Sequence, residues 1–93
     1  MLRQGGEMTF GELENLILLA DRMIVSCAPR KADYGRGYQS GIKYHFYNLQ
    51  TGVPPDHYYL IAEMARSNGC RNVHAYARGY QDGCKGLKPV YTD

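Results

Sequence analysis

The hexapeptide RGYQSG, at residues 36–41, recurs as RGYQDG at residues 78–83. The similarity extends beyond these copies when the chain is aligned with itself at an offset of 42 residues. Nine of the 26 positions from 18 to 43 are then identical without a gap, and LLAD aligns with LIAE. Self-similarity at a fixed period indicates a duplicated supersecondary unit. We expect one unit at about 9–51 and a second at about 52–93.

Each unit is expected to form two helices. In the first unit, Thr9 and Glu12 have the spacing of a capping box, and apolar residues follow at helical intervals toward Cys27. Asp33 is expected to cap a second helix that runs to about Gln50, with Gly52 as its stop. No segment alternates with the period of a strand, so the sequence predicts an all-α fold.

The second unit has its own start and stop signals. Residues 54–56 (PPD) favour the start of a helix that runs through about Ser67 and ends at Gly69. Asn72 is expected to cap a fourth helix through about Lys85. The sequence therefore predicts a single domain at 9–93, with four short helices arranged as two tandem, pseudo-symmetric helical hairpins.

The repeated motif has an unusual pair of interior glycines in each copy. A glycine within a helix costs about 1 kcal/mol relative to alanine, so four of them need a structural reason. On a helical wheel, the glycines and tyrosines share one face, and the four-residue spacing would let another backbone approach closely. We expect a packing seam between the hairpins; the alternative is a ligand that approaches the glycines. The predicted seam residues are Gly37, Gly41, Gly79, Gly83, Tyr34, Tyr38, Tyr76 and Tyr80.

Composition and charge argue against a strongly basic protein and against a membrane-spanning helix. The 93 residues are 44% hydrophobic and 22% charged, which is ordinary for one domain with a modest core. A net charge of +2 gives a weak overall field, so any basic contact must come from a local patch. The apolar stretch at 16–25 is too short and too charged to span a membrane. Three cysteines without a secretory signal favour reduced thiols and a cytoplasmic location.

Two surfaces are candidates for partner binding. A cationic row on the face opposite the seam could meet phosphates or an acidic protein, with Gln39 and Gln81 as polar neighbours; the alternative is a solvated helix face. The row comprises Arg36, Lys43, Arg71, Arg78, Lys85 and Lys88. An aromatic turn could stack bases or anchor a protein, or instead pack the turn or a homodimer interface. The turn comprises Tyr44, His45, Phe46, Tyr47, Tyr58 and Tyr59.

The sequence contains no strong motif for a metal site or for a catalytic group. Cys70 and His74 are four residues apart, and Cys84 and His57 could complete a metal site, but there is no C-x-x-C pair. Cys84 aligns with Ile42 and Cys70 with Ala28 of the other unit, so these two cysteines are expected to be small apolar core residues. No local signature supports a nucleophile, and there is no phosphate loop. We therefore expect no metal, no cofactor and no catalytic residue, and a protein that is not an enzyme.

The repeated motif resembles a stretch of the bacterial ribosome modulation factor family, in which R-G-Y-Q-x-G opens a helix. The resemblance covers about ten residues per copy: residues 36–42 in the first, and 78–83 with Gly86 in the second. That family is shorter and more basic than this chain. The resemblance implies a small, helical, non-enzymatic protein that binds ribosomal RNA and protein.

The N-terminus carries a further hint. The stretch QGGEM, at residues 4–8, can be encoded by a bacterial ribosome-binding site followed by a start codon. In this interpretation Met8 rather than Met1 is the native start, and residues 1–7 are a translated leader; residues 1–8 then precede the domain at 9–93. The gene would then be bacterial or carried by a phage.

Three hypotheses for function follow. The first is a modulator that binds RNA or a ribonucleoprotein, such as the ribosome, through the cationic row and the aromatic turn. The second is a phage or mobile-element protein that inhibits a host defence complex, such as a CRISPR effector, by covering a protein surface. The third is a nucleotide or small-molecule binder with its pocket between the pseudo-symmetric helices. Steep salt dependence distinguishes the first from the second.

Overall fold

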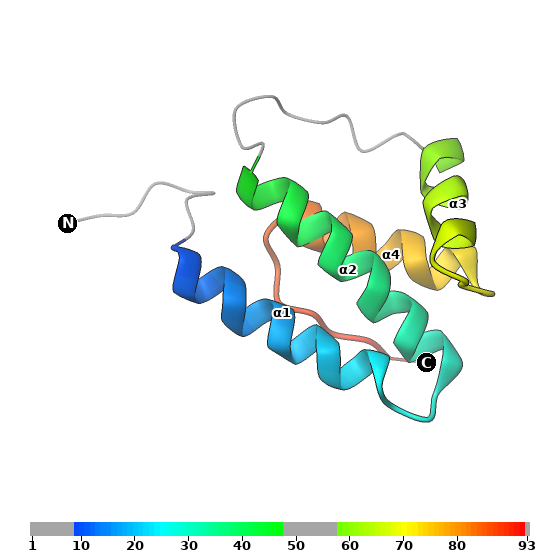
Figure 1. The fold of residues 1–93 in the computed structure, drawn as a ribbon, viewed down its shortest axis with the longest axis horizontal. Coiled ribbons are helices and arrows are strands. Elements are labelled where there is room, and N and C mark those ends of the chain that lie inside the picture. Colours follow the sequence, from blue (N-terminus) through cyan, green and yellow to red (C-terminus); the bar gives the residue numbers. More distant parts are fainter. Residues whose placement is uncertain (1–8, 48–57, 93) are drawn as a thin grey trace.

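The computed structural model describes residues 9–47 and 58–92, apart from the side chains of residues 47 and 58–60. These ranges contain four helices and no strand, which confirms the all-α prediction. The helices are α1 (Phe10–Ile24), α2 (Pro29–Tyr47), α3 (Tyr58–Ser67) and α4 (Val73–Cys84). In Figure 1, α2 and α4 cross at the centre of the molecule; α1 packs against α2, and α3 against α4.

Local signals set several helix ends as predicted. The capping box is present at α1: the Thr9 N–H donates to Glu12 Oε1 at 2.9 Å, and the Glu12 N–H donates to Thr9 Oγ1 at 3.1 Å. At α4, the Asn72 side chain accepts a hydrogen bond from the Ala75 N–H at 2.9 Å. Gly69 and Gly86 follow α3 and α4 with φ of 72° and 74°, a left-handed conformation that favours glycine.

The predicted start of α2 is wrong. The helix begins at Pro29, four residues before Asp33, and α1 already ends at Ile24 rather than near Cys27. Proline suits the first turn of a helix, because the N–H that it lacks would have no partner there. The predicted stop of α2 and the residues 54–56 expected to open α3 lie outside the described part of the chain.

The central contact lies between α2 and α4, at the repeated motif. A Cβ atom on Gly37 would lie 2.0 Å from the carbonyl oxygen of Tyr76, and one on Gly79 would lie 2.0 Å from that of Tyr34. Only glycine permits so close an approach. The space against these glycines is therefore filled by backbone, and a ligand between the two helices at this seam has no room.

The second glycine of each motif repeats the arrangement one turn further along. A Cβ on Gly41 would lie 2.2 Å from the carbonyl oxygen of Tyr80, and one on Gly83 would lie 2.5 Å from that of Tyr38. Each contact thus has a reciprocal contact 42 residues along, at the offset of the sequence repeat. The reciprocal contacts relate α2 to α4 by an approximate two-fold rotation about an axis that runs along the pair.

The buried tyrosines surround this seam. Tyr34, Tyr38 and Tyr76 have no exposed surface. The Tyr34 hydroxyl donates to Asp82 Oδ2 at 2.5 Å, and the Tyr76 hydroxyl lies 3.0 Å from Ser40 Oγ. Ser40 and Asp82 are the one pair of residues that differs between the two hexapeptides. Each hexapeptide therefore supplies the polar partner of the tyrosine that lies two residues before the other hexapeptide. Burial and the bond to Asp82 raise the pKa of Tyr34 to about 12, so its hydroxyl stays a donor at neutral pH.

The C-terminal segment, residues 87–91, breaks the two-fold symmetry. The Tyr38 hydroxyl donates to the Leu87 carbonyl at 2.5 Å, and the Val90 N–H donates to the Tyr34 hydroxyl at 3.2 Å. The Tyr91 ring lies 5.5 Å from the Tyr34 ring, centroid to centroid. This segment therefore covers the hydroxyl ends of Tyr34 and Tyr38.

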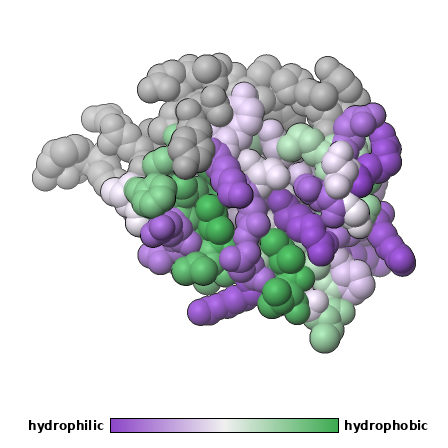
Figure 2. Space-filling model, in the orientation of Figure 1, coloured by the Kyte–Doolittle hydropathy of each residue, from purple (hydrophilic) through white to green (hydrophobic). Residues whose placement is uncertain are grey.

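The surface mixes polar and apolar side chains on the face shown in Figure 2. Leu18, on α1, is 57% exposed, and Val25, which follows the end of α1, is 80% exposed. None of the helices in the described ranges is long and apolar enough to cross a membrane.

The seam predicts opposite effects for two alanine substitutions. Gly37→Ala should lower the free energy of unfolding by about 1–3 kcal/mol, because the new Cβ overlaps the Tyr76 carbonyl. Gly11→Ala is the control: a Cβ there meets only Thr9 Oγ1 at 3.9 Å, so it should raise stability by about 0.5–1 kcal/mol. Urea denaturation measures both, and equal tolerance of the two changes would contradict the seam.

Candidate functional site

The structure divides the predicted cationic row between two faces. Because α2 and α4 meet through their glycine faces, their outer faces point in opposite directions. Arg36 and Lys43 lie on the outer side of α2, whereas Arg78 and Lys85 lie on that of α4. The Arg78 guanidinium is 5.3 Å from the centroid of the Tyr91 ring, so the C-terminal segment already lies against it.

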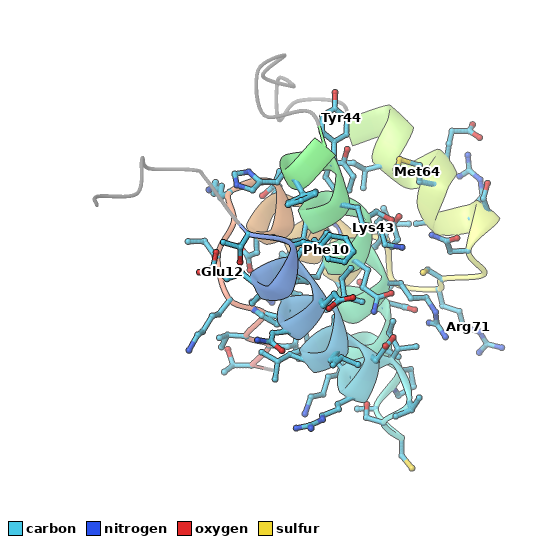
Figure 3. All side chains as sticks on the ribbon, turned by 60° about the vertical axis from the view of Figure 1, so that its left-hand side comes forward. Phe10, Glu12, Lys43, Tyr44, Met64 and Arg71 are labelled. Atoms are coloured by element: carbon cyan, nitrogen blue, oxygen red, sulfur yellow. The ribbon has the colours of Figure 1, made fainter. Side chains whose placement is uncertain are left out.

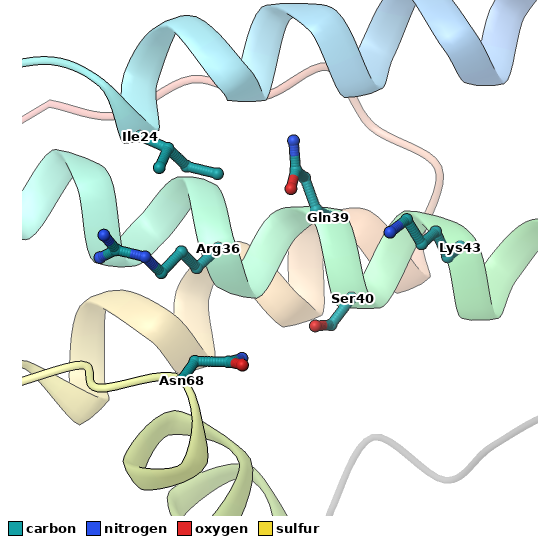
Figure 4. A pocket seen from close by; sticks show the side chains of 6 residues that line it. All are labelled: Ile24, Arg36, Gln39, Ser40, Lys43 and Asn68. Carbon is teal, nitrogen blue, oxygen red and sulfur yellow. The ribbon is translucent and has the colours of Figure 1, made fainter.

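The α2 side contains a hollow of about 350 Å³, seen in Figure 4. The end of α1, the outer face of α2 and the turn after α3 contribute to it. Its lining side chains are Ile24, Arg36, Gln39, Ser40, Lys43 and Asn68. A second hollow of about 260 Å³ shares Ile24 and Arg36 with the first and adds Arg71. Three cations of the predicted row therefore surround two adjoining hollows.

Helical spacing explains how one helix supplies most of this lining. The four lining residues of α2 are spaced at i, i+3, i+4 and i+7, which places them on one face. Gln39 Nε2 is held against α1, because it donates to the Ile17 carbonyl at 3.0 Å and to Asp21 Oδ1 at 2.8 Å. The amide of Gln39 thereby closes the upper edge of the hollow in Figure 4.

The Tyr76 hydroxyl joins the other two sides of the hollow. It lies 3.0 Å from Ser40 Oγ and accepts a hydrogen bond from Asn68 Nδ2 at 3.2 Å. Burial is the main cause that raises the pKa of Tyr76, although its bonds to Ser40 and Asn68 act in the opposite direction. A neutral hydroxyl therefore holds two side chains of the hollow in place.

Asp33 links the hollow to the start of α4. Asp33 is only 4% exposed. Its Oδ1 atom accepts a hydrogen bond from Arg36 Nη1 at 3.0 Å. Oδ2 accepts from the N–H groups of Arg71 and Asn72 at 3.2 and 2.9 Å. The prediction that Asp33 caps its own helix is therefore wrong, because it instead binds the backbone that leads into α4. The ion pair orients Arg36 and offsets its charge, whereas Lys43 and Arg71 are exposed cations.

The aromatic turn contributes less surface than its sequence suggests. Phe46 packs edge-on against Phe10, with 6.1 Å between ring centroids, and His45 Nδ1 lies 2.9 Å from the Cys84 carbonyl oxygen. Tyr44 is half-buried, and Figure 3 shows its hydroxyl directed away from the helices. The side chains of Tyr47, Tyr58 and Tyr59, which complete the predicted surface, lie outside the described residues.

Metal ligands do not gather within 9–47 and 58–92: no group of three or more His, Cys, Asp or Glu residues there could hold an ion. His57, the fourth ligand considered from sequence, lies outside these ranges. Burial, assisted by the charge of Asp33, raises the pKa of the Cys70 thiol to about 11. Burial also raises the pKa of Cys84. Both thiols are therefore neutral at physiological pH and pack as small apolar groups.

Sequence reasoning missed Ser40 and Asn68 as members of a site. Ser40 carried a signal, because it is the one position at which the two hexapeptides differ. Asn68 carried none, since its place beside α2 depends on how α3 and α4 pack. No protein-family model, curated protein or solved structure matches this chain at a significant level.

The role of Asp33 predicts a specific loss of stability. Asp33→Asn removes the charge that Arg36 and two backbone N–H groups contact, so the free energy of unfolding should fall by about 1–3 kcal/mol. Glu63→Gln removes a carboxylate from an exposed pair with Arg66 and should change it by less than about 0.5 kcal/mol. Urea denaturation of both variants provides the measurement, and a neutral Asp33→Asn would contradict this role.

Proposed function

We propose that this chain is a non-enzymatic protein that modulates a bacterial ribonucleoprotein, such as the ribosome, by binding RNA phosphates at the α2 side. The observation that carries the proposal is the grouping of Arg36, Lys43 and Arg71 around two adjoining hollows. Sugar-phosphate contacts use such cations together with neutral polar side chains. The motif's resemblance to ribosome modulation factors supports the ribosome as the partner.

The balance of charge at the hollow supports an anionic ligand of modest affinity. Asp33 offsets the charge of Arg36, so Lys43 and Arg71 supply the cations that remain for phosphates. Two such contacts give a binding energy that falls as salt rises, because each neutralised phosphate releases counterions. The partner therefore needs further contacts, and Tyr44 at the adjoining end of α2 is available for them.

Removing the two cations tests this proposal. Lys43→Ser combined with Arg71→Ser should weaken binding of a single-stranded RNA, measured by fluorescence anisotropy between about 50 and 200 mM salt. The slope of log K against log salt should flatten by about 1.4, at about 0.7 for each lost phosphate contact. Arg78→Ser with Lys85→Ser is the matched control, because it removes the same charge from the opposite face and should leave the slope unchanged.

Two results would contradict the proposal. One is an equal loss in both double variants, which would indicate binding by overall charge. The other is an absence of RNA binding by the unaltered chain at about 50 mM salt, where phosphate contacts are strongest.

The second candidate is occlusion of a protein surface by a phage or mobile-element inhibitor. The observation that favours it is the exposure of two apolar side chains, Leu18 on α1 and Val25 directly after its end. Exposed apolar side chains of this kind can anchor a protein partner. This candidate predicts binding that does not respond to salt, together with no affinity for RNA.

A further inference from the structure

On the outer face of α4, the C-terminal segment occupies the position that corresponds to the hollow on α2. Arg78 Cζ lies 5.3 Å from the centroid of the Tyr91 ring there. The Tyr34 hydroxyl accepts a hydrogen bond from the Val90 N–H and donates one to Asp82. A planar ring over a guanidinium, beside a tyrosine hydroxyl, therefore fills one of two pseudo-equivalent faces.

The hollow has the same elements without an internal occupant among the described residues. Arg36 corresponds to Arg78, Tyr76 to Tyr34 and Ser40 to Asp82, each 42 residues apart. The Asn68 amide donates to the Tyr76 hydroxyl, as the Val90 N–H does to that of Tyr34. Among the residues that the structure describes, the one element without a counterpart on this face is a ring over Arg36.

The two faces differ in where their carboxylates lie. On the α4 face, the Asp82 carboxylate binds the Tyr34 hydroxyl, whereas the hollow has the neutral Ser40 at the equivalent position. The carboxylate at the hollow is that of Asp33, and it is occupied by Arg36 and by two backbone N–H groups. The α4 face therefore suits a neutral aromatic side chain, and the hollow suits a planar ring that carries an anion. A nucleotide has both parts, and bases in single-stranded RNA stack on arginine guanidinium planes.

We propose that the hollow binds one nucleotide of single-stranded RNA, with its base stacked on Arg36 and its phosphate beside Lys43; this inference rests on the proposed function. The ion pair with Asp33 fixes the guanidinium plane before the base arrives. Ser40 and Asn68 keep hydrogen-bonding capacity for the edge of the base, because their bonds to Tyr76 use only part of it.

The stacking step is tested with Arg36→Lys, which keeps the charge but removes the plane. Binding of a fluorescein-labelled pentauridylate should weaken about five- to hundredfold, the range that corresponds to one lost stacked base. The salt slope should stay unchanged, because the count of cations is unchanged. Arg78→Lys is the matched control on the opposite face and should bind the RNA as the unaltered chain does.

The difference between Ser40 and Asp82 at equivalent positions supplies an independent variant. Ser40→Asp copies the arrangement of Asp82, so Tyr76 keeps a polar partner and the fold is preserved. The added carboxylate should weaken pentauridylate binding about tenfold or more, because it puts a negative charge in the same hollow as the phosphate, three residues before Lys43. Gln81→Glu adds the same charge to the exposed outer face of α4 and should leave the affinity within about twofold.

The outcomes separate this inference from the proposed function. If Arg36→Lys and Ser40→Asp bind RNA normally while the Lys43 and Arg71 double variant does not, the nucleotide site is wrong and the phosphate surface stands. If the unaltered chain binds no RNA, both fail. The remaining possible occupant is a protein segment, and the peptide LKPVY, the sequence of residues 87–91, tests it by titration. If the peptide shifts the NMR signal of the Asn68 side-chain amide and the RNA does not, the hollow binds protein and the inference is overturned.

Discussion

The backbone-to-backbone approach of α2 and α4 is the constraint on which the rest of the structure depends. Four glycines give up helix propensity, about 1 kcal/mol each relative to alanine, so that two helices can touch without Cβ atoms between them. Buried tyrosine rings on both sides of the contact offset that loss, because each removes a large apolar area from water. The hairpin partners α1 and α3 and the C-terminal segment all pack around this pair.

The reciprocal contacts give α2 and α4 comparable outer faces, and small differences in sequence distinguish these faces. The α4 face has Asp82 and is covered by the Tyr91 ring over Arg78. The α2 face has Ser40 instead and forms a cation-lined hollow. The difference between Ser40 and Asp82, together with the C-terminal segment, thus accounts for a covered face on α4 and a hollow on α2. The two faces therefore differ at the positions where the sequence repeat is broken.

The sequence predicted the features that local chemistry determines. The number of helices, the Thr9 capping box and the Asn72 cap depend on residues within a few positions of one another. The reason for the glycine pairs was also accessible, because glycine has few uses inside a helix. A helical wheel shows which face of its own helix a residue occupies, but not how that helix is oriented against another. The cations of α2 and α4 were therefore expected in one row, whereas they lie on two faces. The long-range role of Asp33 and the hollow beside Asn68 depend on the packed structure.

Proton NMR can observe the reciprocal contact between the two copies of the motif directly. Nuclear Overhauser cross-peaks should connect the α-protons of Gly37 with the backbone protons of Tyr76, and those of Gly79 with the backbone protons of Tyr34. Both sets should appear with comparable intensity, because the two contacts are equally close. The absence of either set in the folded protein would contradict the seam and, with it, the arrangement of the two outer faces.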